Sequence, residues 1–459
     1  MAATTHERAS VFQTVKVAPE TTAGTAPTSG YKKLTALGFV PTINPTIQVF
    51  RPAGQKYTTV TALNREDTTW ALEGLPTFTE LVYPLSSVLT EALVTAAGGT
   101  TSAAAGSRVM GADGTHWFFK PSAGDADAPV SFTVYKGGIT GAERSSYVQV
   151  GDFSLTFNRN DSTLSGAALG KALVSSALDA TVHMPGNEVQ QIAVSGTGGT
   201  YTLTYAGQTT GNLDFDATAA EVLAALEALS NIPKGALRVD QTVAASPLFT
   251  YLVEFGGSLG ETNVAEMTAT DSLTGGAGTV TITTVTAGAA VTAVGLTPIL
   301  PTQVCIYAFS SAQTDISTTT NETDAYKLTD VMEVVFSVSG RYGPYYTLNC
   351  AEDSFSTMVE MPPTVQLTIK MQANSEGLAY LTQLRNGGTV YFRIKAVGDT
   401  ISSAEEYEFT LDFAGKITAA SELADQDGIY AVTWTWDAVP TLTNGGPVEI
   451  AIVNNVTAL

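Results

Sequence analysis

Apolar and polar residues alternate along most of the chain with a period of two, which is typical of β-strands. The clearest examples are the segments Asp152–Asn158, Gln366–Gln372, Glu406–Phe413 and Tyr430–Trp436. Each segment places large apolar side chains on one face and polar side chains on the other, as strands of antiparallel sandwiches and barrels do. The pattern therefore predicts a mainly β protein, built as a β-sandwich or barrel with few helices.

Three segments depart from this pattern and predict helices. Pro84–Ala97 carries leucines four residues apart and is followed by Gly98, which favours a helix end. Thr218 and Glu221 form a capping box ahead of an apolar stripe. Ser375–Arg385 has a similar leucine stripe and precedes an Asn-Gly-Gly turn.

A change in composition divides the chain into three parts. After Gly196–Gly199 the predicted order is strand, capped helix and three strands, and this segment closes near Gly288. Its length is typical of a small domain. We therefore expect an inserted α+β surface domain, of immunoglobulin-domain size, at residues 192–289. It would interrupt a core whose first part is 1–191 and whose second part is 290–459.

Aromatic residues are concentrated on the predicted strands near the C-terminus. Trp434 and Trp436 fall on the same strand face as Tyr430, and Phe392 and Phe409 lie on other predicted strands. Aligned aromatic side chains occur more often in a core or a subunit interface than in a carbohydrate-binding platform. We therefore expect Phe392, Phe409, Trp434 and Trp436 to be core or subunit-interface residues.

The balance of acidic and basic residues argues against nucleic acids and membranes as binding partners. The chain of 459 residues has 22 Lys and Arg against 43 Asp and Glu, which gives a formal net charge of −21. Basic residues are required to neutralise phosphates and to bind anionic lipids, so specific binding to DNA or to a membrane is not expected. No stretch reaches the roughly 18 consecutive apolar residues of a membrane-spanning helix. His6, Glu7 and Arg8 lie where a Sec-type signal would be apolar, so export is not expected.

The sequence offers no motif for catalysis, cofactor binding or metal binding. The three histidines lack metal-ligand spacing, and the glycine-rich segments are not followed by the lysine of a phosphate-binding loop. Gly256–Gly260 has the spacing Gly-x-Ser-x-Gly, but no helix is predicted to follow it, so a nucleophile elbow is not expected. We therefore expect no enzymatic activity, no cofactor and no metal. Cys305 and Cys350 are expected to be reduced thiols, and the sequence leaves open whether they touch.

Segments on both sides of the predicted insertion resemble the major tail (tail tube) proteins of long, non-contractile-tailed bacteriophages. The resemblance covers roughly 1–190 and 290–459, and the order of the segments carries it. The similar segments are Lys16–Thr25, Phe132–Gly137, Tyr147–Phe157, Ser165–Leu173, Asn386–Gly398, Tyr407–Lys416, Asp425–Trp436 and Ile452–Leu459. The predicted insertion resembles a small β/α module found in structural proteins of actinobacterial phages, and an actinobacterial host is implied.

The resemblance implies a structural virion protein of a siphophage, assembled in the host cytoplasm and located in the tail. Subunits would form rings, hexameric in this family, that stack into a tube. The implied partners are other copies of the chain, the tape-measure protein, and the tail terminator and tail-tip proteins. DNA would pass through the lumen during ejection without specific binding, which the acidic composition permits.

One segment is a candidate for contact between stacked rings. Residues Ile43–Trp70 alternate poorly and contain two prolines and a glycine between apolar stretches. We interpret this segment as a long loop that reaches the next ring, with Phe50, Tyr57 and Trp70 as the inter-ring contact residues.

Two other functions remain as alternatives. A receptor-binding or capsid-decorating phage protein would form monomers or trimers in place of rings. A carbohydrate-cleaving enzyme would use a pair of acidic residues brought together by folding. The sparse histidines and the lack of a nucleophile elbow make the enzyme the less favoured of these two alternatives.

Overall fold

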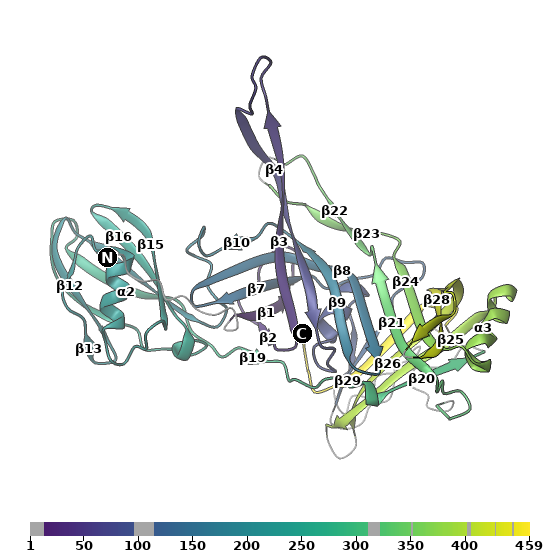
Figure 1. Ribbon diagram of the computed structural model, residues 1–459. Helices are drawn as coiled ribbons and strands as arrows, with labels where there is room; N and C mark the ends of the chain where they lie inside the picture. The colour runs from purple at the N-terminus through teal and green to yellow at the C-terminus, as the bar shows by residue number, and fades with distance from the viewer. Residues whose placement is uncertain are drawn as a thin grey trace.

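The protein is described by a computed structural model that covers residues 13–95, 114–310, 322–349, 352–401, 405–426, 428–442 and 445–459. Figure 1 shows a β-rich body, a smaller α+β unit to its left, and a narrow two-stranded projection above the body. Strands dominate the secondary structure, so the prediction of a mainly β protein is confirmed. His6 and Cys350 lie outside the described residues.

One row of antiparallel strands forms the first side of the body. In order across the sheet these strands are β3 (Leu37–Phe50), β4 (Val60–Gly74), β9 (Ser162–Gly170), β8 (Gly141–Asn158), β21 (Val331–Ser339), β24 (Thr364–Gln372) and β28 (Ile429–Ala438). Among the described strands β3 pairs with β4 alone, so β3 is an edge of this row.

A second row of antiparallel strands forms the other side. Its order is β20 (Val304–Phe309), β25 (Thr389–Thr400), β26 (Glu406–Ala420), β29 (Val448–Asn454), β6 (Thr115–Phe119) and β5 (Leu93–Thr95). The first part of β26 pairs with β29 and its last part pairs with β28. This one long strand therefore joins the two rows at a corner.

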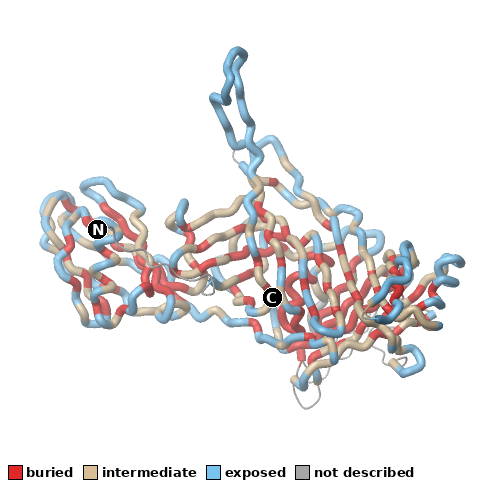
Figure 2. Tube along the Cα trace, viewed as in Figure 1, coloured by how far each residue is buried: buried red, intermediate tan, exposed pale blue. Residues whose placement is uncertain are grey.

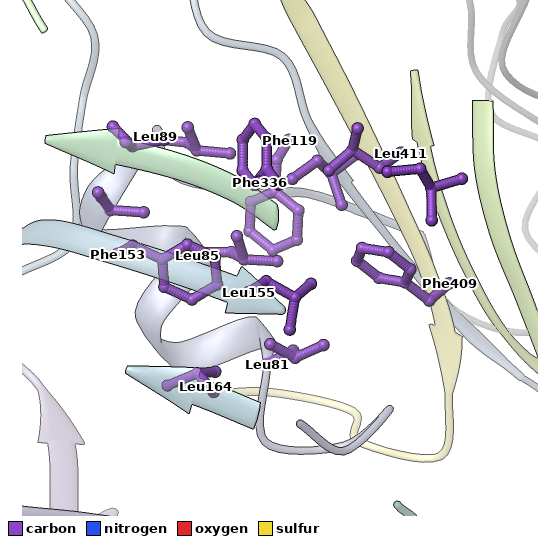
Figure 3. Packing of buried hydrophobic residues seen from close by; sticks show 14 of the residues in the cluster. Leu81, Leu85, Leu89, Phe119, Phe153, Leu155, Leu164, Phe336, Phe409 and Leu411 are labelled. Carbon is purple, nitrogen blue, oxygen red and sulfur yellow. The ribbon is translucent and has the colours of Figure 1, made fainter. Parts of the chain in front are cut away.

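The core lies between these two rows. Figure 3 shows Leu155 of β8 and Phe336 of β21 on one side, with Phe409 and Leu411 of β26 on the other. Helix α1 (Val82–Val88) contributes Leu85 to this core, and the residues flanking the helix contribute Leu81 and Leu89. All of these side chains are buried, so the body has one continuous core.

The predicted strand faces are confirmed with one exception. Every second residue of β8, β24 and β26 that was expected to be apolar and inward-facing is buried. On β28, Trp434 and Trp436 are buried, whereas Tyr430 is 69% exposed. Tyr430 lies at the end of β28 that pairs with the short strand β27 (Ala424–Gln426), where the core no longer covers the sheet.

A smaller group of strands extends the body toward the α+β unit. It contains β1 (Thr14–Pro19), β2 (Lys32–Leu34), β7 (Phe132–Gly138), β10 (Val174–Ser175), β19 (Thr292–Ala293) and the first part of β8. Tyr31 and Tyr135 pack edge to face in its separate small core, with ring centroids 5.4 Å apart.

The α+β unit, here called the module, comprises residues 188–286 and has its own core. One sheet has the order β15 (Leu237–Ala245), β16 (Leu248–Phe255), β11 (Glu188–Ser195) and β18 (Thr279–Thr286). The other contains β12 (Gly198–Tyr205), β13 (Gln208–Thr209), β14 (Leu213–Asp214) and β17 (Thr268–Thr274). Helix α2 (Ala219–Glu227) packs with them through Val222 and Leu226.

The boundaries of the module differ slightly from the expected ones. Strand β11 begins at Glu188, four residues before the expected start at 192, because it pairs with both β16 and β18. Strands β11 and β17 were absent from the expected strand order. The chain leaves and rejoins the body at adjacent points, since the amide of Ala289 donates to the carbonyl of Gly186 over 2.9 Å.

Two of the three predicted helices are confirmed and one is corrected. The capping box of Thr218 and Glu221 is present at the start of α2. Helix α3 (Ser375–Asn386) starts after Asn374, which accepts two backbone N–H bonds, and ends at Gly387 with a positive φ. Helix α1 is shorter than expected, because the chain beyond it returns to the sheet as β5.

Candidate assembly surface

The predicted loop Ile43–Trp70 is a long β-hairpin, so the interpretation of this segment as a loop is wrong. Strands β3 and β4 pair along their whole lengths, from Leu37 opposite Gly74 to Phe50 opposite Val60. Strand β9 pairs with β4 only from Thr68 onward. Residues 43–67 therefore form a two-stranded projection beyond β9, here called the ribbon, which is roughly 25 Å long at the usual rise per residue.

The ribbon is exposed over most of its length. Figure 2 shows this contrast with the buried strands of the body. A two-stranded hairpin is marginally stable in water by itself, and unpaired edge strands promote association with other chains. The ribbon therefore has the properties of a surface that is completed by a partner.

The apolar face of β3 continues from the core into the solvent. Its alternate residues Leu37, Phe39, Pro41, Ile43, Pro45, Ile47 and Val49 are all apolar. Leu37 and Phe39 are buried at 3% and 5% exposure, whereas Ile47 and Val49 are 53% and 60% exposed. Leu63 pairs with Ile47 and is 51% exposed on the same face. The face that forms core at one end of the strand is thus uncovered at the other.

The structure separates the three residues that were expected to contact the next ring. Phe50 and Tyr57 lie at the ribbon tip, defined as residues 46–64, and are 51% and 74% exposed. Trp70 is fully buried and packs edge to face with Phe39, with ring centroids 6.4 Å apart. The assignment of Trp70 as a contact residue is therefore wrong, because its side chain belongs to the core beneath the ribbon.

The ribbon tip has an unusual charge for this protein. It contains Arg51 and Lys56 and no Asp or Glu, in a chain whose formal net charge is −21. The turn is closed by two backbone bonds, from Gln55 to Pro52 at 3.1 Å and from Thr59 to Phe50 at 3.1 Å. The tip is therefore a compact cationic element with exposed aromatic side chains.

A second segment supports the base of the ribbon. The hydroxyl of Tyr346, just after β22 (Tyr342–Tyr345), donates to Asp67 Oδ2 at 2.7 Å. The Arg65 guanidinium lies 4.1 Å from the centre of the Tyr346 ring. Asn44 donates to the other oxygen of Asp67 at 3.0 Å. Burial, and then the bond to Asp67, raise the pKa of Tyr346 to about 12.

A buried carboxylate fixes the turn from which β3 starts. Glu80 is fully buried, and its two oxygens accept the backbone N–H groups of Thr35, Ala36 and Leu37 at 2.5–3.1 Å. Carboxylates that accept several backbone bonds make strong, geometrically defined contacts. The direction of the hairpin is therefore fixed at the start of β3 by Glu80 and at the base of the ribbon by Tyr346.

The predicted aromatic cluster lies in the core of the body. Phe392 and Trp436 pack edge to face at 4.7 Å, and Tyr380 of α3 lies against Trp436 and Trp434. Trp434 also donates to the carbonyl of Gly377 at 2.8 Å. Phe409 is fully buried in the same core cluster. Of the two expected roles, core or interface, the four predicted residues take the core role in this chain.

Several features that sequence reasoning missed contribute to this surface. The segments 341–349 and 352–361, which support the ribbon, carried no recognised motif. The side-chain alternation of β3 was present in the sequence, but Pro45, Pro52 and Gly54 favoured a loop there. A shift in register between Thr46 and Ile47 leaves Asn64, between Leu63 and Arg65, without a partner in the pairing.

In the described part of the chain, no three His, Cys, Asp or Glu side chains come together in a way that would hold a metal ion. His116 is buried near Glu405, with 3.5 Å between Nε2 and the carboxylate, and His183 lies 3.4 Å from buried Glu254. Cys305 is a half-buried free thiol. Among the described helices, none has the length and apolar character needed to cross a membrane.

Comparison with known proteins does not assign the chain to a family. No protein-family model matches the sequence, and no curated protein matches it. The function must therefore be argued from the sequence and from the assembly surface itself.

Proposed function

We propose that this protein is a self-assembling structural subunit, and specifically the tail tube protein of a long, non-contractile-tailed phage. The observation that carries the proposal is the apolar face of β3, which is continuous with the core and uncovered over the ribbon. Contiguous exposed apolar surface of this kind marks protein–protein contact sites. A second copy of the same chain is the partner that a structural subunit meets at high concentration.

The geometry suits repeated association. A projection on one part of the subunit that contacts a different part of its neighbour makes a heterologous interface. Such interfaces close into rings or continue as filaments, depending on the rotation between subunits. Edge strand β3 adds a row of backbone groups that pair with nothing else among the described strands. Both features favour assembly over a monomeric role.

The resemblance of the flanking sequence to tail tube proteins supports the specific form of the proposal. Under it the subunits form stacked rings in the phage tail, with the tape-measure, tail terminator and tail-tip proteins as further partners. The lumen would conduct DNA, and the net charge of −21 on each chain disfavours DNA adhesion. The proposed role is structural and needs neither catalysis nor a cofactor.

Electron microscopy of the purified protein over a concentration series tests the proposal. The wild type should form hollow rings or tubes of uniform diameter. The double variant Ile47→Thr with Leu63→Thr removes apolar surface from the ribbon and keeps high strand propensity. Burying an Ile or Leu contributes about 1.5–3 kcal/mol, and about 1.4 kcal/mol is tenfold in association. The variant should therefore need at least about tenfold more protein to assemble.

A matched control lies at the inner end of the same hairpin, outside the ribbon tip. Val40→Thr with Leu75→Thr removes apolar surface from two side chains that are 47% and 51% exposed and should leave assembly near the wild-type level. Equal effects of the two double variants would contradict the role of the β3 apolar face. Wild-type protein that stays monomeric or trimeric at every concentration, with or without tail-tip components, would overturn the tube proposal.

The alternative of a receptor-binding or capsid-decorating protein has one observation in its favour. The module has its own core and lies to one side of the body, as a presented binding domain would. The oligomeric state distinguishes this alternative from a tail tube protein. Monomers or trimers that bind a cell surface or a capsid would support it.

A further inference from the structure

The body carries a groove that the ribbon of the same chain does not occupy. The groove has a volume of about 790 Å³ and is lined by segments 121–126 and 360–365 together with the adjoining ends of β28 and β29. Its size is within the range of sites that hold a ligand or an inserted peptide element. The ribbon tip extends away from the body in Figure 1.

The groove is apolar and rigid over much of its lining. Five prolines line it: Pro121, Pro362, Pro363, Pro440 and Pro447. Proline fixes the backbone angle φ and has no N–H group, so these segments lose little freedom when a partner binds. Leu89, Val365 and Val448 contribute aliphatic surface. A preformed apolar groove of this kind suits aromatic side chains that insert from a partner.

The charges that line the groove are predominantly negative. Asp125, Glu360 and Asp437 are lining residues, and Arg341 is the one basic lining residue. Arg341 is already paired with Asp127 and with Glu360, the latter at 2.9 Å. Asp125 is exposed at the rim. The groove therefore has an excess of negative charge that its own side chains do not balance.

The ribbon tip complements both the apolar lining and the negative charge of the groove. It presents Phe50 and Tyr57 as exposed aromatic side chains, and Arg51 and Lys56 as its only charged residues. We propose that the acidic, proline-lined groove receives the cationic ribbon tip of a second copy of this chain. This inference rests on the proposed self-assembly and identifies which surfaces meet.

The contact has a direction, because tip and groove are different surfaces. Each copy offers one tip and one groove, so association continues from copy to copy. Opposite charges on the two surfaces speed the encounter and select the register. Assembly should therefore be faster at low salt, since screening at high ionic strength weakens attraction between exposed charges.

Charge reversal with mixing tests the inference. The tip variant Arg51→Glu with Lys56→Glu and the groove variant Asp125→Lys with Asp437→Lys should each raise the assembly concentration at least tenfold at low salt. An equimolar mixture of the two variants should assemble again, because each wild-type surface then meets a complementary one and the two reversed surfaces meet each other.

The control changes net charge by the same amount outside the groove. Asp216→Lys with Glu422→Lys reverses two exposed acids and should not impair assembly. Circular dichroism and thermal unfolding check that every variant is folded. A groove variant that assembles like this control, while the tip variant fails, would overturn the groove as the receiving surface and leave the tube proposal intact.

A cross-linking experiment tests the same contact without relying on tubes. Tyr57 is replaced by the photo-crosslinking amino acid p-benzoylphenylalanine, and cross-linked peptides are mapped by mass spectrometry. Intermolecular links to 121–126, 360–365 or 437–448 are expected. Such links without rings or tubes would support the groove and count against the tube function. Links only to other regions, or none at concentrations where the chain self-associates, would overturn the inference.

Discussion

The hydroxyl of Tyr346 donates a hydrogen bond to Asp67 over 2.7 Å, and this bond ties the base of the ribbon to the segment that contains β22 and β23 (Thr357–Glu360). The same tyrosine ring lies under the Arg65 guanidinium. A second tie is the backbone bond from Glu66 to Asp353 at 2.7 Å. The ribbon therefore leaves the body at a defined angle, even though its outer part has no covering strand.

Burial, together with the bond to Asp67, gives Tyr346 a specific pH dependence. Its pKa is raised to about 12, whereas an unperturbed tyrosine has a pKa of about 10. Because the folded-state pKa is the higher one, the stabilising contribution is complete below about pH 10 and is lost as the pH rises to about 12. NMR of protein with ¹³Cζ-labelled tyrosine checks this. The resonance that disappears in Tyr346→Phe should shift with a midpoint near 12, and a midpoint near 10 would contradict the bond.

Truncation of Trp70 should lower the stability of the fold, whereas truncation of Tyr57 should weaken self-association and leave stability nearly unchanged. Trp70→Ala removes a fully buried side chain and should lower the free energy of unfolding by about 3–5 kcal/mol. Tyr57→Ala changes an exposed side chain, so unfolding should change by less than about 0.5 kcal/mol while self-association weakens. Urea unfolding and sedimentation velocity measure the two effects. A large loss of stability in Tyr57→Ala would show that the tip packs within its own chain.

Glu80 should contribute to the free energy of unfolding, because its buried carboxylate holds the turn before β3. Glu80→Gln replaces one acceptor oxygen by an N–H₂ group that faces backbone donors, which should cost about 1–3 kcal/mol. Glu73→Gln on β4 is the matched control, because this side chain is exposed. Denaturant unfolding compares the two variants. Hydrogen exchange should accelerate at 35–37 in Glu80→Gln, and unchanged exchange there would argue against the role of Glu80 in fixing the turn.

Excision of the module should leave a folded body that still assembles. A short glycine-serine linker replaces 188–286, which is feasible because Gly186 and Ala289 are hydrogen-bonded neighbours. The cut removes Glu261, which pairs with Lys16 of β1 at 2.7 Å. Burial lowers the pKa of Lys16, and after the cut its ammonium keeps only the bond to the Pro185 carbonyl at 2.6 Å and has lost its carboxylate partner, which would be unfavourable.

Adding Lys16→Met to the excised chain is therefore expected to raise the melting temperature relative to excision alone. Thermal unfolding and electron microscopy measure stability and assembly for both forms. Failure of both forms to assemble, although folded, would mean that the module contributes to the subunit contacts.

Local signals in the sequence were sufficient to predict some helix boundaries and misleading for others. The capping box at Thr218 and the turn at Gly387 act within a few residues, and they placed α2 and the end of α3 correctly. The stripe of leucines after Pro84 predicted a longer α1. There Leu93 lies in β5, opposite Phe118 of β6, so a distant strand determines the conformation.

The hairpin shows why the assembly surface was only partly predictable. Pro45, Pro52 and Gly54 suggested a loop, because proline cannot donate to a ladder and both residue types favour turns. Pro45 instead lies on edge strand β3, where one side has no neighbouring strand and the missing N–H costs nothing in the ladder. That β3 is an edge follows from pairings between distant segments, such as β4 with β9, which the local pattern does not contain.

The crossing at Gly186 and Ala289 has a consequence for how such subunits diversify. Gly186 has a φ of +89°, and a Cβ there would lie 2.7 Å from the Ala289 carbonyl oxygen, so the two connecting segments meet at a constriction that admits glycine alone. Whatever folded unit occupies the space beyond this constriction needs only two closely spaced termini. The position is therefore suited to replacement of the module by another folded domain, which under the proposed assembly would be displayed once per subunit.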